Sequence, residues 1–247
     1  MKKLEESIND VNDVSKEAKK SSVNQENVFE LTNHMEQYIS KKMSVKSIKA
    51  QQNILVDINK ISVTRYDLKT LQCQNWVNDR IIYAYLCLLC LKSKQKIFSI
   101  DPLIFKVLER GDFSKASKFH KGVNMLQFEK IFIPINYPEN HHWFLCLVDL
   151  KKNIIQSFDS LDKIGRHDGI LRTISDFFTQ KYSLTYKFDL QCDCDIPMQE
   201  NSFDCGVFTM LFADCLSRNS PFDFKQADIP RLRKIIMYEI LTKSIVH

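Results

Sequence analysis

The sequence has no long hydrophobic run: its longest apolar stretch, Ile81–Leu91, ends after eleven residues. A helix that crosses a bilayer needs about 20 residues, so no membrane span is expected. Residues 1–30 also lack a basic start followed by an apolar run, because Lys, Glu and Asp recur throughout them. We therefore expect an intracellular protein of the nucleus and/or cytoplasm that is not secreted by a signal peptide. Delivery into a host cell as an effector stays open.

Charge of one sign is not in excess, and no segment repeats. The chain carries 35 Lys and Arg against 30 Asp and Glu, a net charge of +5 over 247 residues. Because basic and acidic residues are nearly equal in number, the chain has no dedicated phosphate-binding surface, and no nucleic-acid partner is expected. The lack of internal repeats excludes solenoids and repeat arrays.

The eight cysteines are scattered through a chain large enough to fold without disulfides, which favours a reducing compartment. Each thiol is then buried filler, a metal ligand or a reactive group. Structural zinc sites usually present two cysteine pairs with about two to four intervening residues, whereas one residue separates Cys192 from Cys194. The remaining candidate ligands are Asp195, His141, Cys205 and the pair Cys87 and Cys90, which lies within an apolar helix. We expect no metal and no cofactor.

The first fifty residues contain no Gly, Pro, Cys or Trp, which separates them from the rest of the chain. Their apolar residues recur at helical spacing from Val28 through Met35 to Ile39, which predicts one amphipathic helix packed on the domain or on a partner. Residues 1–22 are expected to be loose. We divide the chain into a polar N-terminal extension, 1–50, and a domain, 51–247.

Alternating apolar runs and polar breaks begin at about Ile61 and predict a mixture of helices and strands. Asn78 or Asp79 can cap a helix that continues through Leu89, and Asp101-Pro102 opens another. Strands are predicted at 130–136, 142–149, 153–158 and near 184–190, and helices at about 166–180, 205–217 and 228–242. The short Leu-Lys-Lys connection after 142–149 suits a hairpin. The expected fold class is α+β with a central sheet.

Cys205 lies at the start of the predicted helix 205–217. The unpaired N–H groups and the positive end of the helix dipole favour the thiolate there, which is the nucleophilic form. Gly206 adds no side chain that would obstruct a substrate carbonyl. An arbitrary cysteine in this position is more often a small buried residue, so a catalytic interpretation requires a base nearby.

The predicted hairpin supplies both a base and a carboxylate. His142 begins one strand beside Trp143, and Asp159 ends the next. An antiparallel hairpin can therefore place His142 and Asp159 at nearly the same level, at one end of the strand pair. A thiol nucleophile needs an imidazole to take its proton and a carboxylate to orient that imidazole. Gln199, on the loop before Cys205, can donate its amide to an oxyanion together with the Cys205 N–H; a surface glutamine is the plain alternative.

These segments together resemble the ubiquitin-like-protein-specific cysteine proteases, the SUMO or sentrin proteases. The matching motifs occur in order within about residues 61–243: Trp76-Val-Asn-Asp79, His142-Trp143, Phe158-Asp-Ser-Leu161, Pro197-x-Gln-x-Asn-x-x-Asp-Cys-Gly-Val-Phe208 and Gln226–Ile240. The resemblance implies a papain-like cysteine protease fold of this type, with a central mixed sheet flanked by helices.

The resemblance also implies roles for single residues. The implied catalytic residues are His142 as base, Asp159 as its orienting carboxylate, Gln199 as oxyanion donor and Cys205 as nucleophile. The implied substrate-binding residues are Trp76, Asp79, Trp143 and Gly206, with the two tryptophans flanking a narrow channel for a C-terminal Gly-Gly. Two aromatic faces can enclose a strand only where that strand has no side chains. His141 is then a bystander, and ordinary core filling is the alternative for the tryptophans.

The sequence departs from the family pattern at two places. Val77 replaces the usual Leu, a mild change in volume, and Asn201-Ser202 replaces the usual Asn-Gly before the cysteine. The second change removes a glycine from a tight turn where a positive φ can be required. We expect an adjusted loop geometry and unchanged chemistry.

The resemblance implies a hydrolase: a thiol protease and deSUMOylase-like isopeptidase that cleaves after the C-terminal Gly-Gly of a ubiquitin-like modifier, with SUMO first among the candidates. Deconjugation, precursor processing or both are compatible with it, and a monomer is expected. One alternative is a protease of the same fold acting on ubiquitin or another modifier. A second is a catalytically inert modifier-binding protein, which the presence of all four catalytic residue types argues against.

Overall fold

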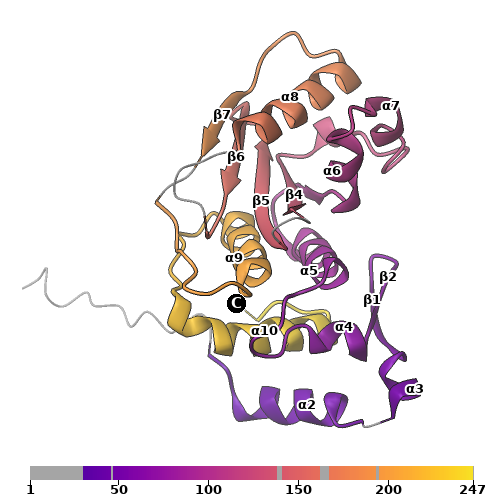
Figure 1. Ribbon diagram of the computed structural model, residues 1–247, viewed down its shortest axis with the longest axis vertical. Helices are drawn as coiled ribbons and strands as arrows, with labels where there is room; N and C mark the ends of the chain where they lie inside the picture. Colours follow the sequence, from indigo (N-terminus) through magenta and orange to yellow (C-terminus); the bar gives the residue numbers. More distant parts are fainter. Residues whose placement is uncertain (1–29, 46, 138–140, 162–166, 193–194, 247) are drawn as a thin grey trace, which may run out of the picture. The chain divides into compact units, whose positions relative to one another are not determined.

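A mixed five-stranded sheet forms the centre of the computed structural model, which describes residues 30–246 apart from 46, 138–140, 162–166 and 193–194 (Figure 1). The strand order is β3 (Ile97–Ser99), β4 (Lys130–Tyr137), β5 (His142–Asp149), β6 (Ile154–Phe158) and β7 (Asp189–Cys192). The two outer pairs are parallel and the two inner pairs antiparallel. The expected central mixed sheet is confirmed.

The middle strand, β5, is buried along its whole length because helices cover both of its faces. Alternate residues of a strand point to opposite faces. Phe144 and Val148 share a core with Ile174 and Phe178 of α8 (Asp168–Tyr182). The other face packs against α9 (Cys205–Arg218), which lies beside α5 (Asp79–Lys92). The sheet with its flanking helices gives the α+β arrangement that the sequence predicts.

The helices expected after the sheet strands are present with slightly shifted ends. α8 was expected at 166–180, α9 at 205–217 and α10, which spans Ile229–Thr242, at 228–242. α5 begins as expected, since the side chain of Asn78 accepts a hydrogen bond from the Ile81 N–H at 3.0 Å. α6 (Leu103–Leu108) follows Asp101, whose carboxylate accepts from the Leu103 N–H at 2.8 Å.

Several short elements are absent from the sequence prediction. They are α3 (Ile48–Gln51), β1 (Ile54–Ile58), β2 (Ile61–Thr64), α4 (Arg65–Lys69), β3, α7 (Phe113–Ala116), and the 3-10 turns η1 (Met125–Gln127) and η2 (Gln226–Asp228). β1 and β2 form a hairpin through Asn59 and Lys60, which both have positive φ, at 49° and 68°. Two consecutive residues with positive φ match the right-handed twist of paired strands, so this tight turn closes without glycine.

The strand expected near 184–190 is displaced toward the C-terminus. Only Asp189–Cys192 pairs with β6, starting opposite Ile154. The apolar residues at 184, 186, 188 and 190 alternate as they would in a strand, but in the parallel register those before Asp189 lie ahead of the first residue of β6, Ile154, and have no strand partner there. Phe188 instead packs in the core with α8, so its alternation reports burial and not pairing.

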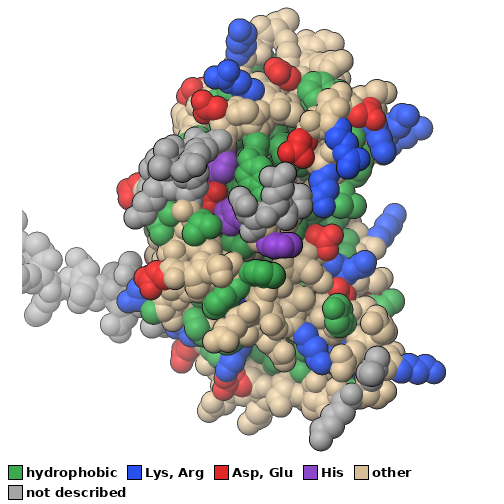
Figure 2. Space-filling view, viewed as in Figure 1, with side chains coloured by type: hydrophobic (Ala, Val, Ile, Leu, Met, Phe, Trp, Pro, Cys, Tyr) green, Lys and Arg blue, Asp and Glu red, His purple; other side chains and the backbone are tan. Residues whose placement is uncertain are grey.

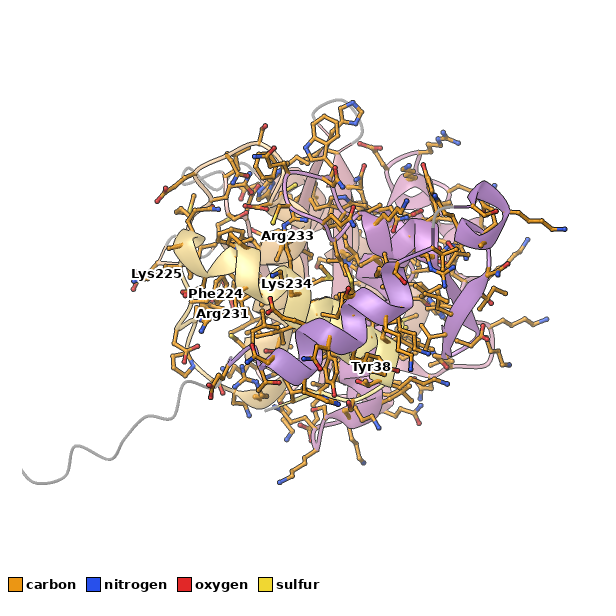
Figure 3. The ribbon with its side chains drawn as sticks, turned by 90° about the horizontal axis from the view of Figure 1, so that it is seen from below. Tyr38, Phe224, Lys225, Arg231, Arg233 and Lys234 are labelled. Carbon is orange, nitrogen blue, oxygen red and sulfur yellow. The ribbon has the colours of Figure 1, made fainter. Side chains whose placement is uncertain are left out.

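The helix expected from Val28 to Ile39 is α2 (Asn33–Met43), and Val28 and residues 1–22 lie outside the described residues. Thr32 caps it by accepting from the Met35 N–H. α2 lies along α10, as Figure 3 shows from below. The rings of Tyr38 in α2 and Tyr238 in α10 meet edge to face, with their centroids 5.5 Å apart. Residues Leu31–Val246 form one compact unit. The division at residue 50 stays a prediction.

Among the described residues, no helix has both the length and the apolar character required to cross a membrane.

Candidate active site

Cys205 is the first residue of α9, at the helix end where the sequence predicts it. The backbone carbonyl of Asp204 starts the helix by accepting from the N–H groups of Val207 and Phe208, at 2.8 and 3.1 Å. The side chain of Cys205 is 2% exposed, and its Sγ lies 3.9 Å from the carbonyl oxygen of His141. The thiol therefore sits against the start of β5, at the positive end of a helix dipole.

His142 and Asp159 are brought together by the β5–β6 hairpin. His142 is the first residue of β5, and Asp159 follows Phe158, the last residue of β6, which pairs with Leu145. The hairpin places Nε2 of His142 2.7 Å from Oδ1 of Asp159, with both side chains buried. The contact expected from the hairpin is therefore present.

His142 also contacts Cys205, and its two partners set its protonation. Burial lowers the pKa of His142, but hydrogen bonds with Asp159 and Cys205 and their negative charges raise it more, so that it moves from 6.5 to about 9. Since Nε2 is bonded to Asp159, the contact with the sulfur falls to Nδ1. An imidazole with this pKa stays protonated at neutral pH and can stabilise a neighbouring thiolate.

Asp159 holds a second histidine that the sequence interpretation missed. Nε2 of His167 lies 2.9 Å from Oδ2 of Asp159, and the N–H of Leu161 donates to Oδ1 at 2.9 Å. Burial raises the pKa of Asp159, but hydrogen bonds with His142, His167 and Leu161 lower it more, well below its usual range. The only sequence signal for His167 is its place at the start of the helix predicted at about 166–180, which follows Asp159.

Gln199 is tied to the residue after Asp159. Its side-chain oxygen accepts from Ser160 Oγ at 2.7 Å, and its backbone N–H donates to the Ser160 carbonyl at 2.9 Å. Its amide nitrogen donates to the carbonyl of Asn201. An amide nitrogen carries two hydrogens, so a second N–H remains for a developing oxyanion. Gln199 is also 7% exposed, so it is not the surface glutamine of the plain alternative.

The two tryptophans line one open hollow of about 330 Å³, to which Asp79 also contributes. Trp143 is buried, whereas Trp76 is 53% exposed. The ring of Trp76 stacks on that of His141, with centroids 5.2 Å apart and planes 19° from parallel. Figure 2 shows histidine and hydrophobic side chains gathered on this face of the molecule. His141, expected to be a bystander, thus lines the hollow together with the two tryptophans.

Gly206 is required by the packing of the fold around it. A Cβ at this position would come within 3.0 Å of Val77 Cβ, 3.2 Å of Ile82 Cδ1 and 3.6 Å of Trp143 Cδ1. The start of α9 can approach α5 and β5 this closely only because residue 206 has no side chain. The sequence interpretation assigned this glycine to the substrate carbonyl alone.

The turn before Cys205 forms without the usual glycine. Neither Asn201 nor Ser202 has a positive φ. The Asn201 side chain closes the turn instead: its Oδ1 accepts from the N–H groups of Phe203 and Asp204 at 3.1 and 3.0 Å. The backbone carbonyl of Ser202 accepts from Trp76 Nε1 at 2.9 Å. An asparagine that bonds the backbone two residues on is a common alternative to a glycine turn.

The eight residues singled out from the sequence therefore lie in one region, while their individual roles remain predictions. Among the described residues, no three His, Cys, Asp or Glu side chains are placed to hold a metal ion. Cys194 lies outside the described residues.

Comparison with known proteins identifies one family. Residues 75–245 match the model of the Ulp1 protease family, C-terminal catalytic domain. Sentrin-specific protease 2 of Rattus norvegicus is 30% identical over 232 residues, which cover 90% of this chain and 39% of the rat protein. Sentrin-specific protease 5 of Mus musculus is 31% identical over 200 residues, covering 76% of this chain and 25% of the mouse protein. The chain thus spans less than half the length of these relatives.

Solved structures agree with this match. The X-ray structure of the C-terminal Ulp1 protease domain in complex with Smt3, the yeast ortholog of SUMO, is similar with a TM-score of 0.79 and 26% identity, over 88% of this chain and 98% of that chain. A structure of the SUMO protease Ulp1 with its catalytic cysteine oxidised to a sulfenic acid has a TM-score of 0.77 and 27% identity, over 87% and 97%. The expected protease fold is confirmed.

Proposed function

Since the chain belongs to the Ulp1 protease family, we propose that it is a cysteine protease and isopeptidase that cleaves after the C-terminal Gly-Gly of a ubiquitin-like modifier, with SUMO as the first candidate. The relatives named sentrin-specific proteases and the Ulp1 complex with Smt3 support this substrate class. Deconjugation, precursor processing or both would use the same bond cleavage.

One observation carries the proposal: His142 contacts both Asp159, at 2.7 Å, and the Cys205 thiol at the start of α9. In the proposed reaction, the Cys205 thiolate attacks the carbonyl carbon of the terminal glycine. The protonated His142 then gives its proton to the departing lysine amine or peptide nitrogen, and a thioester forms. His142 next takes a proton from water, which attacks the thioester and releases the modifier and the thiol.

Gln199 and the Cys205 N–H are the proposed donors to the oxyanion of each tetrahedral intermediate. Asp159 keeps the imidazole oriented, as a carboxylate does in other nucleophile–histidine pairs. Trp76 and Trp143 are the proposed walls of the channel for the Gly-Gly tail, and their shared hollow supports this assignment. Asp79, on the same hollow, is a proposed contact for the body of the modifier.

The experiment is covalent labelling with a panel of modifiers that carry a C-terminal electrophile. We expect the SUMO probe to label Cys205, and labelling to disappear in Cys205→Ala and His142→Ala while both variants keep their fold. Labelling by the ubiquitin probe alone would assign the other substrate. Modifier binding without any covalent product would identify an inert binder, and labelling that survives in Cys205→Ala would move the nucleophile elsewhere.

The protease domain is proposed to span residues 51–247, with residues 1–50 as an N-terminal extension and a monomer as the working form. The family match at 75–245 lies inside the proposed domain. An intracellular location remains part of the proposal.

A further inference from the structure

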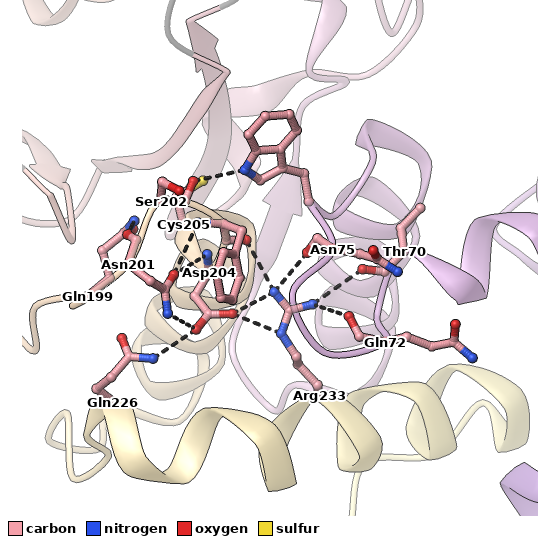
Figure 4. Close-up of polar contacts among 12 residues, drawn as sticks. Thr70, Gln72, Asn75, Gln199, Asn201, Ser202, Asp204, Cys205, Gln226 and Arg233 are labelled. Atoms are coloured by element: carbon pink, nitrogen blue, oxygen red, sulfur yellow. Dashed lines mark hydrogen bonds and ion pairs between the residues drawn. The ribbon is translucent and has the colours of Figure 1, made fainter.

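Arg233 is a buried charge that the proposed reaction does not use. It lies in the first half of α10 and its side chain is 2% exposed. Its Nη2 and Nε atoms lie 2.6 and 2.9 Å from Oδ1 of Asp204, whose side chain is 5% exposed (Figure 4). A buried charge is stable only when it is paired and its hydrogen bonds are made.

The rest of the guanidinium binds backbone carbonyls from two separate segments. Nη1 donates to the carbonyls of Thr70 and Gln72, at 3.3 and 3.2 Å. Nη2 donates to those of Asn75 and Phe203, at 3.0 and 3.2 Å. Every N–H of the Arg233 guanidinium is therefore directed at the segment 70–75 or at the turn 203–204, and none of them is left for solvent.

Each of these segments leads directly into one part of the site. Trp76 follows Asn75, and Cys205 follows Asp204. The two segments meet a second time where Trp76 Nε1 donates to the carbonyl of Ser202 at 2.9 Å. The exposed channel tryptophan and the start of α9 are thus joined at two points, with the guanidinium on the side away from solvent.

Asp204 transmits this contact to the nucleophile. Its second carboxylate oxygen accepts from Asn201 Nδ2 at 2.7 Å and from Gln226 Nε2 at 2.8 Å, so four hydrogen bonds hold the carboxylate. Its backbone carbonyl is the first acceptor of α9. A carboxylate held this way fixes the backbone of the residue that precedes Cys205.

Arginine suits this place because its planar fork can address one carboxylate and several carbonyls at once. Lysine offers a single compact ammonium with three donors, which cannot reach both segments in the same geometry. The pair also joins three parts of the chain that are far apart in the sequence: the segment after α4, the turn before α9 and α10.

We propose that Arg233 is a positioning residue of the active site, which sets the spacing between the Trp76 segment and the start of α9 and so the opening through which the substrate tail reaches Cys205. The tail is that of the proposed function, on which this role in catalysis rests. The spacing itself is a property of the free protein and can be measured without any substrate.

The test compares Arg233→Lys with Glu239→Gln, a matched control on the same helix. Glu239 is fully buried and accepts from Tyr85 Oη at 2.9 Å and from the Val246 N–H at 3.0 Å, two partners that lie outside both site segments. Acrylamide quenching of tryptophan fluorescence reports the exposed Trp76, since Trp143 is 7% exposed. We expect the quenching constant to rise about 1.5-fold or more in Arg233→Lys at a temperature where both variants are folded, and to stay unchanged in Glu239→Gln.

Two labelling rates at Cys205, read by mass spectrometry of its peptide, separate the opening from the chemistry. A displacement of about 1 Å can cost about 10²-fold in rate, so the modifier probe should label Arg233→Lys about tenfold or more slowly than the parent. Iodoacetamide, which needs no channel, should label Arg233→Lys and the parent at similar rates.

Equal quenching constants in Arg233→Lys and Glu239→Gln, or a parallel loss of both labelling rates in Arg233→Lys, would overturn the positioning role. A parent protein that no modifier probe labels would overturn the proposed function alone, and the quenching result would still decide the role of Arg233.

Discussion

His167 donates from Nε2 to Oδ2 of Asp159 at 2.9 Å, on the carboxylate oxygen opposite the one that His142 uses. Its ring stacks on Phe144 of β5, with centroids 4.1 Å apart and planes 11° from parallel. Nδ1 of His167 is buried and has no hydrogen-bond partner among the described residues, so the ring makes its polar contact through Nε2 alone. His167 thus holds the Asp159 carboxylate through one nitrogen, while its ring is fixed by Phe144.

Replacing His167 by Leu should lower kcat and leave KM nearly unchanged. Leu fills much of the volume but cannot donate, so the Asp159 carboxylate loses one of the bonds that orient it toward His142. We expect a loss of about tenfold in kcat, a fraction of the roughly 10²–10⁴ that a positioned acid–base group contributes. His167→Gln keeps an N–H donor and should recover part of the rate. Equal loss in the Leu and Gln variants would mean that packing alone is responsible.

The cleavage rate should fall as the pH rises through about 9, where His142 loses its proton. Above that pH no acid is left for the departing amine, whereas alkylation by iodoacetamide requires no acid. A pH series should therefore show a falling rate of amide cleavage beside an undiminished rate of iodoacetamide labelling at Cys205. Cleavage that stays level well above pH 9 would contradict the assignment of His142 as the acid.

The same proton contributes to stability with a definite sign. The pKa of His142 is raised from 6.5 to about 9 by folding, so the folded state holds the proton more tightly. This contribution is complete below about pH 6.5 and is lost as the pH rises through about 9.

In Asp159→Asn the charged acceptor is gone, and the decline in the cleavage rate should begin at lower pH than in the parent. A decline at the same pH would show that Asp159 does not set the pKa of His142.

Gln199→Ala should slow turnover by about 10²–10³, or roughly 2.7–4 kcal/mol of barrier, if its amide stabilises the oxyanion. Ser160→Ala provides a matched variant, because Ser160 Oγ donates to the oxygen of that amide at 2.7 Å and only orients it. Steady-state kinetics should show a smaller loss for Ser160→Ala than for Gln199→Ala. Unchanged turnover in Gln199→Ala would remove the residue from this role.

Gly206→Ala should destabilise the fold, because its new methyl group would lie 3.0 Å from Val77 Cβ. Overpacking of a close contact costs about 1–3 kcal/mol. Gly169→Ala in α8 is the control, since a Cβ there meets nothing within 4 Å and alanine restricts the unfolded chain. It should add about 0.4–1 kcal/mol to the free energy of unfolding in urea. If Gly206→Ala unfolded with the same free energy as Gly169→Ala, the start of α9 would be able to shift and make room for the methyl group.

The sequence determined the parts of the site that depend on local geometry. A helix that begins at Cys205 and a hairpin between His142 and Asp159 follow from spacing and short connections, and the structure places both as predicted. The order of motifs also identified the family, because each motif is short and continuous. The spacing from Val28 to Ile39 predicted a helix, and α2 continues past Ile39 to Met43 through Ser40, Lys41 and Lys42, which have no apolar periodicity.

Only the tertiary structure decided the contacts that join distant segments. The strand near 184–190 moved to Asp189–Cys192 because its parallel pairing can start only where β6 begins, at Ile154. His167 binds Asp159 while its ring stacks on Phe144. Arg233 binds Asp204, which lies 29 positions earlier in the chain. A charged or polar side chain has no periodicity that reveals its partner, because its position is set by the packing of whole elements. Local pattern therefore predicted which residues form the site, and packing decided which residues hold them in place.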